Sequence, residues 1–233
     1  MAKPSASAEK MIVTISEPMT LATDYLLGTL CELCAVLLLK HNGLRQTSIR
    51  LWALAFLAVA IGSYAGGTYH GFQHALSVPV ATALWKVTTI SMGVASFLLL
   101  AAAITAAFTG QDRLWLLAGA ALKLAIYVVW MLGHDEFRFV IYDYGSTLAI
   151  LMLLVAAERT HGVERHRLYI ASGILVSIAA AVVQQSGIRL HRHFNHNDLM
   201  HVVQMGGMWL LYKGGARLRD GIRHRGASDG RQS

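Results

Sequence analysis

Two histidine clusters hold the residues of this chain that are best suited to chemistry. Residues 194–201 carry His196, Asp198 and His201 at the start of an apolar stretch, and a second cluster around His70 closes another such stretch. Ionisable groups at the end of a membrane span are costly, and their usual explanation is a working site. Imidazoles suit zinc, and a catalytic zinc has three protein ligands and a water. Metal binding is therefore a concrete hypothesis.

Seven apolar stretches must position these residues. An apolar helix needs about 20 residues to cross a bilayer, and 55% of this chain is hydrophobic but only 14% charged. We expect spans at roughly 19–39, 50–70, 82–108, 114–132, 139–157, 168–188 and 198–214, each end uncertain by about four residues. The sequence thus predicts an all-α integral membrane protein, with one seven-helix bundle at 13–220 and flexible tails at 1–12 and 221–233.

The distribution of basic residues gives an orientation. Thirteen lysines and arginines fall in the first, third and fifth connections and the C-terminal end, against five on the opposite side. Because cytoplasmic loops carry the excess of positive charge, we expect the N-terminus outside and the C-terminus in the cytoplasm. This orientation accounts for the net charge of +7 without a nucleic-acid partner. We expect a bacterial cytoplasmic membrane protein with both histidine clusters toward the outer face.

Polar residues collect near the expected outer ends of the helices, among them Asp24, Ser63, Asp143 and Gln204, whereas the inner halves are plainer. This asymmetry predicts one polar cavity in the outer half of the bundle. Ser63 lies seven residues before His70 and so on nearly the same helix face. It would hydrogen-bond either a ligand or its own helix backbone.

The geometry of the last stretch depends on where its helix begins. His196 and His201 are five positions apart, so they converge only if the helix starts after His196. Asn197 or Asp198 would make a suitable N-cap for such a start. Asp198 and His201 share a face in any case, because they are three residues apart.

We expect His70, His196 and His201 to bind zinc, with Asp198 as the alternative third ligand. Zinc would lower the pKa of its water to about 7. Asp198 or Asp143 would then accept a proton or orient a ligand. The alternative is that these histidines are hydrogen-bonded residues at the membrane interface.

Three further residues carry simpler expectations. Cys31 and Cys34 lie within one apolar stretch, and we expect two buried small hydrophobes there. Lys123 stands in the middle of the fourth stretch, where it would pair with a carboxylate such as Glu32 or extend to the interface.

Seven spans, a histidine at the end of the second and a histidine pair at the start of the seventh resemble the alkaline ceramidase and adiponectin-receptor superfamily. The resemblance implies a seven-helix membrane hydrolase, or a hydrolase-like receptor, with zinc held by three histidines. That family usually carries serine four residues before the His70 position, where this chain has Gly66. It usually shows His-x-x-x-His in the last helix, where Asn197 precedes His201. The chain is therefore similar to a divergent member.

Two other properties are implied only by the resemblance. The family's aspartate near the start of the third helix has no counterpart here, because Trp85 and Lys86 occupy that region. Ceramidases also bind calcium through acidic residues near the N-terminus, where this chain has Glu17, Asp24 and Glu32.

Three functions are compatible with these residues. The first is a zinc-dependent hydrolase of a lipid amide or ester, with a substrate drawn from the bilayer and Ser63 stabilising the oxyanion. The second is a receptor or sensor whose structural metal is closed by a fourth ligand from His74, His193 or Asp198. The third is a haem-binding electron carrier, which would show a Soret band.

Overall fold

The computed structural model describes residues 15–40, 45–157, 165–192 and 194–221, and structural statements below concern these residues. They form seven α-helices: α1 (Pro18–Leu38), α2 (Thr47–Phe72), α3 (Val78–Ala107), α4 (Gly110–Gly133), α5 (Arg138–Ala157), α6 (Arg165–Ser186) and α7 (His196–Gly215). Each predicted stretch coincides with one helix, within the expected slack at both ends. The predicted tails lie outside the described residues, apart from Gly221.

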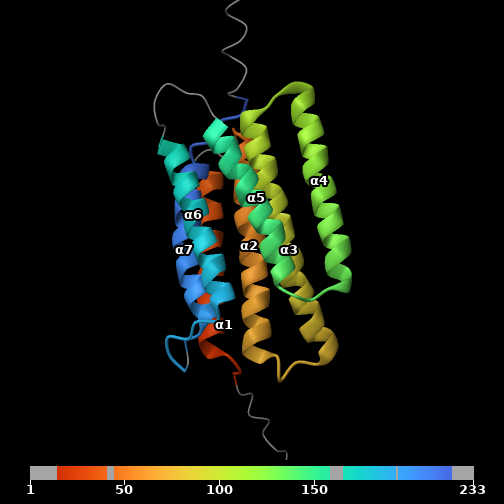
Figure 1. The fold of residues 1–233 in the computed structure, drawn as a ribbon, viewed down its shortest axis with the longest axis vertical. Coiled ribbons are helices and arrows are strands. Elements are labelled where there is room, and N and C mark those ends of the chain that lie inside the picture. The colour runs from red at the N-terminus through yellow and green to blue at the C-terminus, as the bar shows by residue number, and fades with distance from the viewer. Residues whose placement is uncertain (1–14, 41–44, 158–164, 193, 222–233) are drawn as a thin grey trace, which may run out of the picture.

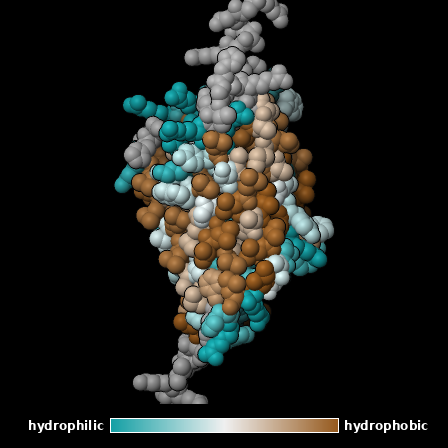
Figure 2. Space-filling view, turned by 60° about the vertical axis from the view of Figure 1, so that its left-hand side comes forward, coloured by the Kyte–Doolittle hydropathy of each residue, from teal (hydrophilic) through white to brown (hydrophobic). Residues whose placement is uncertain are grey.

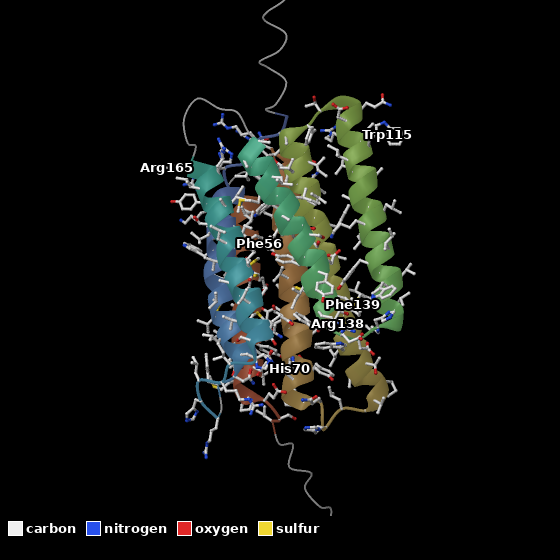
Figure 3. All side chains as sticks on the ribbon, viewed as in Figure 1. Phe56, His70, Trp115, Arg138, Phe139 and Arg165 are labelled. Atoms are coloured by element: carbon white, nitrogen blue, oxygen red, sulfur yellow. The ribbon has the colours of Figure 1, made fainter. Side chains whose placement is uncertain are left out.

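The helices run up and down along the chain and form one elongated bundle (Figure 1). The start of α1, the end of α2 and the start of α7 therefore meet at the same end, the lower one in Figure 1. His70 lies near this end in Figure 3. The fold thus brings the two histidine clusters of the sequence to one level of the bundle.

The outer surface has the character of a membrane protein. Six of the described helices, α1 to α6, are long and apolar enough to cross a membrane. Figure 2 shows a broad hydrophobic surface between hydrophilic patches at the two ends. Such a belt is what a bilayer requires of a helix bundle, because the hydrocarbon core accepts apolar side chains and self-satisfied backbone.

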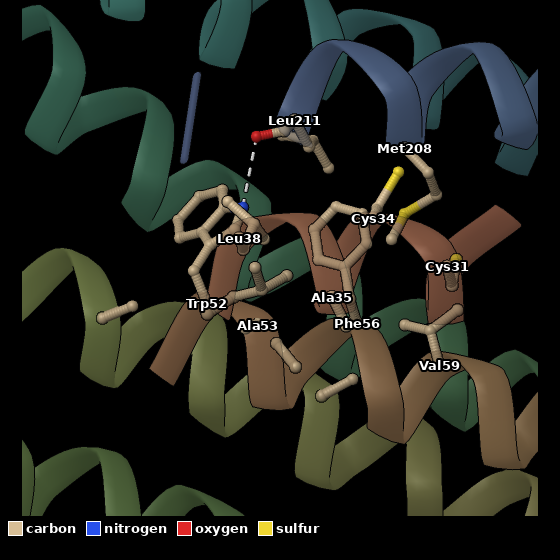
Figure 4. Close-up of a cluster of buried hydrophobic side chains, with 14 of the residues drawn as sticks. Cys31, Cys34, Ala35, Leu38, Trp52, Ala53, Phe56, Val59, Met208 and Leu211 are labelled. Carbon is tan, nitrogen blue, oxygen red and sulfur yellow. Dashed lines mark hydrogen bonds between the residues drawn. The ribbon is translucent and has the colours of Figure 1, made fainter. Parts of the chain in front are cut away.

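The tightest core lies between α1, α2 and α7, away from the histidine end (Figure 4). Trp52 and Phe56 are fully buried there, and the Trp52 Nε1 donates to the Leu211 carbonyl at 3.2 Å. Cys31 and Cys34 are free thiols in the same cluster, which confirms the expectation that they act as small buried hydrophobes. These contacts fix α7 against α1 and α2, and so fix the depth of His201.

An internal ion pair ties α4 to its neighbours. The Lys123 Nζ lies 2.5 Å from the Asp143 Oδ1 and 3.2 Å from the Ser96 hydroxyl, so it joins α4 to α5 and α3. Lys123 therefore pairs with a carboxylate, which was one of its two expectations, but the suggested partner Glu32 is wrong, because Glu32 accepts from Tyr64 on the surface between α1 and α2. Most of the large apolar side chains of α4 are exposed, and its Tyr127 and Met131 are buried.

A carboxylate from the chain end caps α2 at the opposite end of the bundle. The Thr47 and Ser48 amides donate to the two oxygens of Asp220 at 2.8 and 2.9 Å, and the Asp220 amide donates to Gln46. Partial burial raises the pKa of Asp220, but the hydrogen bonds from Ser48 and Thr47 together lower it below the usual value. The segment after α7 is thereby fastened to the start of α2.

Candidate functional site

A cavity of about 890 Å³ lies inside the histidine end of the bundle. Helices α1, α2, α3, α5, α6 and α7 all contribute to its wall. Most of the wall is apolar, and its polar part includes Asp24, Ser63, His70, His196 and His201. Four of these five residues belong to the site predicted from the sequence.

The cavity opens sideways between α5 and α6. Gly145 on α5 and Ile178 and Val182 on α6 line the cavity and are also exposed on the outer surface. Two further exposed lining residues, Gln185 and Ser186, lie at the end of α6. The exposed part of the lining is thus small or apolar along α5 and α6, and polar where α6 ends.

The most buried polar contact in the wall joins α1 to α7. The His201 Nε2 lies 3.2 Å from the Asp24 Oδ1, and both side chains are 8% exposed. The His201 Nδ1 lies 3.0 Å from the Thr23 hydroxyl. Each ring nitrogen of His201 therefore contacts a polar side chain of α1.

The single proton of the Thr23 hydroxyl decides the tautomer of His201. Three acceptors lie within its reach: the Met19 and Thr20 carbonyls, at 3.0 and 3.2 Å, and the His201 Nδ1. If Thr23 donates to the Nδ1, the Nε2–H of His201 donates to the Asp24 Oδ1. If Thr23 donates to a carbonyl and accepts the Nδ1–H, either a proton or a metal cation must join the Nε2 to the Oδ1.

Glycine at position 66 makes room for the Asp24 carboxylate. A Cβ at Gly66 would stand 3.6 Å from the Asp24 Oδ2 and 3.2 Å from the Thr88 Cγ2. A longer side chain would reach into the space that the carboxylate occupies. Because His70 follows one helical turn later on the same face of α2, the carboxylate lies one turn deeper than His70.

The start of α7 differs from the prediction. Its N-cap is Asn195, and His196 is the first helical residue; the expected cap at Asn197 or Asp198 is wrong, because the Asn195 side chain accepts from the Asn197 amide at 2.7 Å. Asp198 completes a capping box by accepting from the Asn195 amide at 2.7 Å. His196 and His201 nevertheless both reach the cavity wall.

The two carboxylates that were predicted to transfer a proton lie in different parts of the structure. Asp198 is fully buried, and its second oxygen accepts from Thr20 at 2.8 Å. Asp143 pairs with Lys123 and lines a smaller cavity of about 450 Å³ beside α4 and α5. Among the described residues, neither carboxylate belongs to the wall of the large cavity. The two oxygens of Asp198 instead accept the hydrogen bonds that cap α7 and join it to α1.

The remaining candidate residues that the structure describes lie either in the cavity wall or on the surface of the bundle. Ser63 is buried at 4% exposure and lines the cavity. His74 follows the end of α2 at Phe72 and is exposed, in agreement with the prediction that it has left the helix. His193 lies outside the described residues.

Asp24 is the site residue whose role sequence reasoning missed. It was noted only as one polar residue near the start of a span. The available signal was the spacing of Glu17, Thr20, Thr23 and Asp24, which places four polar side chains on one face of α1. A polar face on an otherwise apolar span must point into the bundle.

The donors present fit zinc in chemistry and, for one pair, in spacing. Two ligands of a tetrahedral zinc with bonds of about 2.0–2.1 Å lie about 3.3 Å apart, and the Asp24 and His201 donor atoms are 3.2 Å apart. Nδ1 atoms of His70 and His196 are buried without a hydrogen-bond partner in the part of the chain that the structure describes. Within that part, no three or more of His, Cys, Asp and Glu are gathered closely enough to hold a metal ion.

Comparison with known proteins places the chain in a family. No curated protein and no solved structure matches it. One family model matches residues 19–220, which span all of α2 to α7 and nearly all of α1. The chain therefore belongs to DUF6962, which is described as a family of unknown function.

Proposed function

We propose that this chain is a zinc-dependent membrane hydrolase that cleaves a lipid amide or ester inside the bundle. The observation that carries the proposal is the laterally open apolar cavity whose polar wall holds the Asp24–His201 pair. A long acyl chain would be accommodated by the apolar wall, and its carbonyl would lie at the polar end. The resemblance to the ceramidase and adiponectin-receptor superfamily supports the same function.

The proposal includes a seventh span and an orientation. α7 has 20 residues, enough to cross a bilayer, and its polar residues His201 and Gln204 line the cavity rather than face lipid. The histidine end lies toward the outer face, since the excess of lysine and arginine lies at the other end of the bundle.

Asp24 and His201 would hold the zinc ion through Oδ1 and Nε2, and His70 or His196 would complete the ligand set. The bound ion would supply a water with a pKa of about 7 and polarise the substrate carbonyl. Thr23 would leave the Nε2 of His201 available to the ion by accepting its Nδ1–H while donating to the backbone of its own helix. The ion would then take one lone pair from the Nε2 and one from the Asp24 Oδ1.

Other wall residues would carry out the proton and hydrogen-bond steps. When water adds to the carbonyl carbon and the C–N or C–O bond breaks, the leaving nitrogen or oxygen needs a proton. The histidine among His70 and His196 that does not bind the ion would accept the proton that the water loses and then donate it to the leaving group. Ser63 would donate a hydrogen bond to the carbonyl oxygen as its negative charge develops.

Elemental analysis of detergent-purified protein tests the proposal. We expect about one zinc per chain in the wild type, loss of zinc in His201→Ala and Asp24→Ala, and full zinc in His74→Ala. The last variant removes a histidine next to the site but outside the cavity wall. Zinc-loaded protein should hydrolyse lipid amides or esters in mixed micelles, and the zinc-free variants should not.

The outcomes separate the alternatives. A folded wild type purified without chelator that contains no zinc would refute the hydrolase proposal, and a Soret band in that sample would favour the haem carrier. Zinc that binds but supports no hydrolysis would favour the receptor or sensor.

A further inference from the structure

Glu17 lies where α1 begins and α2 ends. It is the residue directly before α1, and the neighbouring Ser16 amide donates to the Gly71 carbonyl in the last turn of α2 at 2.8 Å. The Glu17 Oε1 lies 3.5 Å from the His70 Nδ1. The backbone contact therefore brings a carboxylate to the histidine on the adjacent helix.

A side chain that follows α2 holds the Glu17 carboxylate in place. The Gln73 Nε2 donates to the Oε1 at 3.3 Å, and the Thr20 hydroxyl, whose proton goes to Asp198, lies 3.1 Å from the Oε2. The carboxylate is about one-third exposed, so it reaches His70 from the rim of the bundle. Its position is thus set by α1 and α2 together and does not depend on His70.

The His70 ring is confined between this carboxylate and aromatic neighbours. Tyr69 and Trp85 meet it edge to face, with centroids 5.5 and 6.0 Å away. The Nδ1 is buried without a hydrogen-bond partner in the described structure, the Glu17 Oε1 at 3.5 Å is the carboxylate oxygen that faces it, and the residue lines the cavity. Since a carboxylate facing one ring nitrogen favours the proton there, the other nitrogen is left as a lone pair.

We propose that Glu17 is a positioning residue, which accepts the Nδ1–H of His70 and so presents the Nε2 to the cavity as a metal ligand. The inference rests on the proposed function, because it assigns a partner to one of the zinc-binding residues. Such outer partners fix the tautomer and orientation of the ligating imidazole, and their loss commonly weakens metal binding 10- to 100-fold.

Zinc affinity in detergent, measured by competition with a chelating dye, tests this inference. We expect Glu17→Ala to bind zinc about 10- to 100-fold more weakly. Glu17→Gln should recover much of the loss, because its amide oxygen still accepts the Nδ1–H. The visible spectrum of the cobalt-substituted protein should change in Glu17→Ala and remain near that of the wild type in Glu17→Gln.

Tyr25→Phe is the matched control. The Tyr25 hydroxyl bonds to Thr68 at 2.9 Å, which is another contact between α1 and α2, on the exposed surface. We expect wild-type zinc affinity and cobalt spectrum in this variant. Equal weakening in Tyr25→Phe and Glu17→Ala would overturn the inference, since general helix packing would then explain both.

The result also distinguishes this inference from the proposed function. If the wild type binds zinc and Glu17→Ala binds it within twofold of the wild type, the inference fails and the hydrolase proposal stands. If the wild type itself binds neither zinc nor cobalt, both fail together.

Discussion

Replacing Asp24 by asparagine is expected to abolish the stabilisation by zinc and to leave the stability of the metal-free protein nearly unchanged. In the metal-free wild type, one proton joins the Asp24 Oδ1 to the His201 Nε2 across 3.2 Å, whereas zinc would take a lone pair from each atom. Asparagine keeps the size of the side chain, and its amide group can pair with the Nε2 in either tautomer of His201. The substitution therefore keeps the metal-free contact and removes an anionic ligand from the proposed zinc site.

The expected changes in Tm follow from the free energy of one hydrogen bond and from that of zinc binding at one site. A hydrogen bond contributes about 0.5–1.5 kcal/mol net, and 1 kcal/mol shifts the Tm of a protein of this size by about 2–4 °C. Chelator-treated Asp24→Asn should thus melt within about 2–4 °C of chelator-treated wild type, because one hydrogen bond replaces another. Zinc at 100 times its Kd stabilises a binding protein by about 2.7 kcal/mol. The wild type should gain about 5–10 °C from zinc, and Asp24→Asn almost nothing.

Thermal unfolding in detergent, with and without chelator, measures both effects. Asp24→Ala is the companion variant, because it leaves the His201 Nε2 without a partner. It should lower the free energy of unfolding of the metal-free protein by about 1–3 kcal/mol. A Tm of metal-free Asp24→Asn several degrees below that of the wild type would refute the reasoning, since the pair would then be a satisfied ion pair. An unchanged zinc shift in Asp24→Asn would refute the assignment of Asp24 as a ligand.

Three other predictions concern the frame around the site. Asp143→Ala should lower the free energy of unfolding by about 3 kcal/mol or more, because Lys123 loses its partner; thermal unfolding should show most of it restored in Lys123→Met/Asp143→Leu. The pKa of Asp220 is lowered in the folded protein, so its stabilisation is present above about pH 4 and lost as the pH falls through the folded value. Asp220→Asn should therefore reduce the Tm at pH 7 and flatten its fall in acid, and an equally steep acid limb would contradict this. Gly145→Leu should reduce kcat/KM for long-chain substrates at unchanged zinc content, with Gly145→Ala near wild type, because a Cβ there meets no atom within 4 Å; equal activity would place the opening elsewhere.

The helices were predictable because each span carries its own signal. An apolar run of about 20 residues is legible without knowledge of its neighbours, and α1 to α6 all have it. α7 was predicted from its own apolar run at 198–214, although its hydropathy is reduced by residues such as Asp198 and His201. Those polar residues are tolerated because they face α1 and the cavity.

The partners of the site residues were not predictable in the same way. Spacing shows which residues of one helix share a face, but it does not show which helix that face meets. Asp198 looked available for proton transfer until the structure placed Thr20 on one oxygen and the Asn195 amide on the other. Lys123 was expected to pair with Glu32, and only the packing of α4 against α3 and α5 shows why Asp143 is nearer.

The polar face of α1 organises the site more than either histidine cluster does. Glu17 reaches His70 on α2, while Thr23 and Asp24 take both ring nitrogens of His201 on α7. Each of these contacts lies at the first two turns of one helix, so a small rotation of α1 would displace both histidines at once. The position of His70 relative to His201 is therefore set by the packing of α1 in the core beyond, where Cys31 is fully buried.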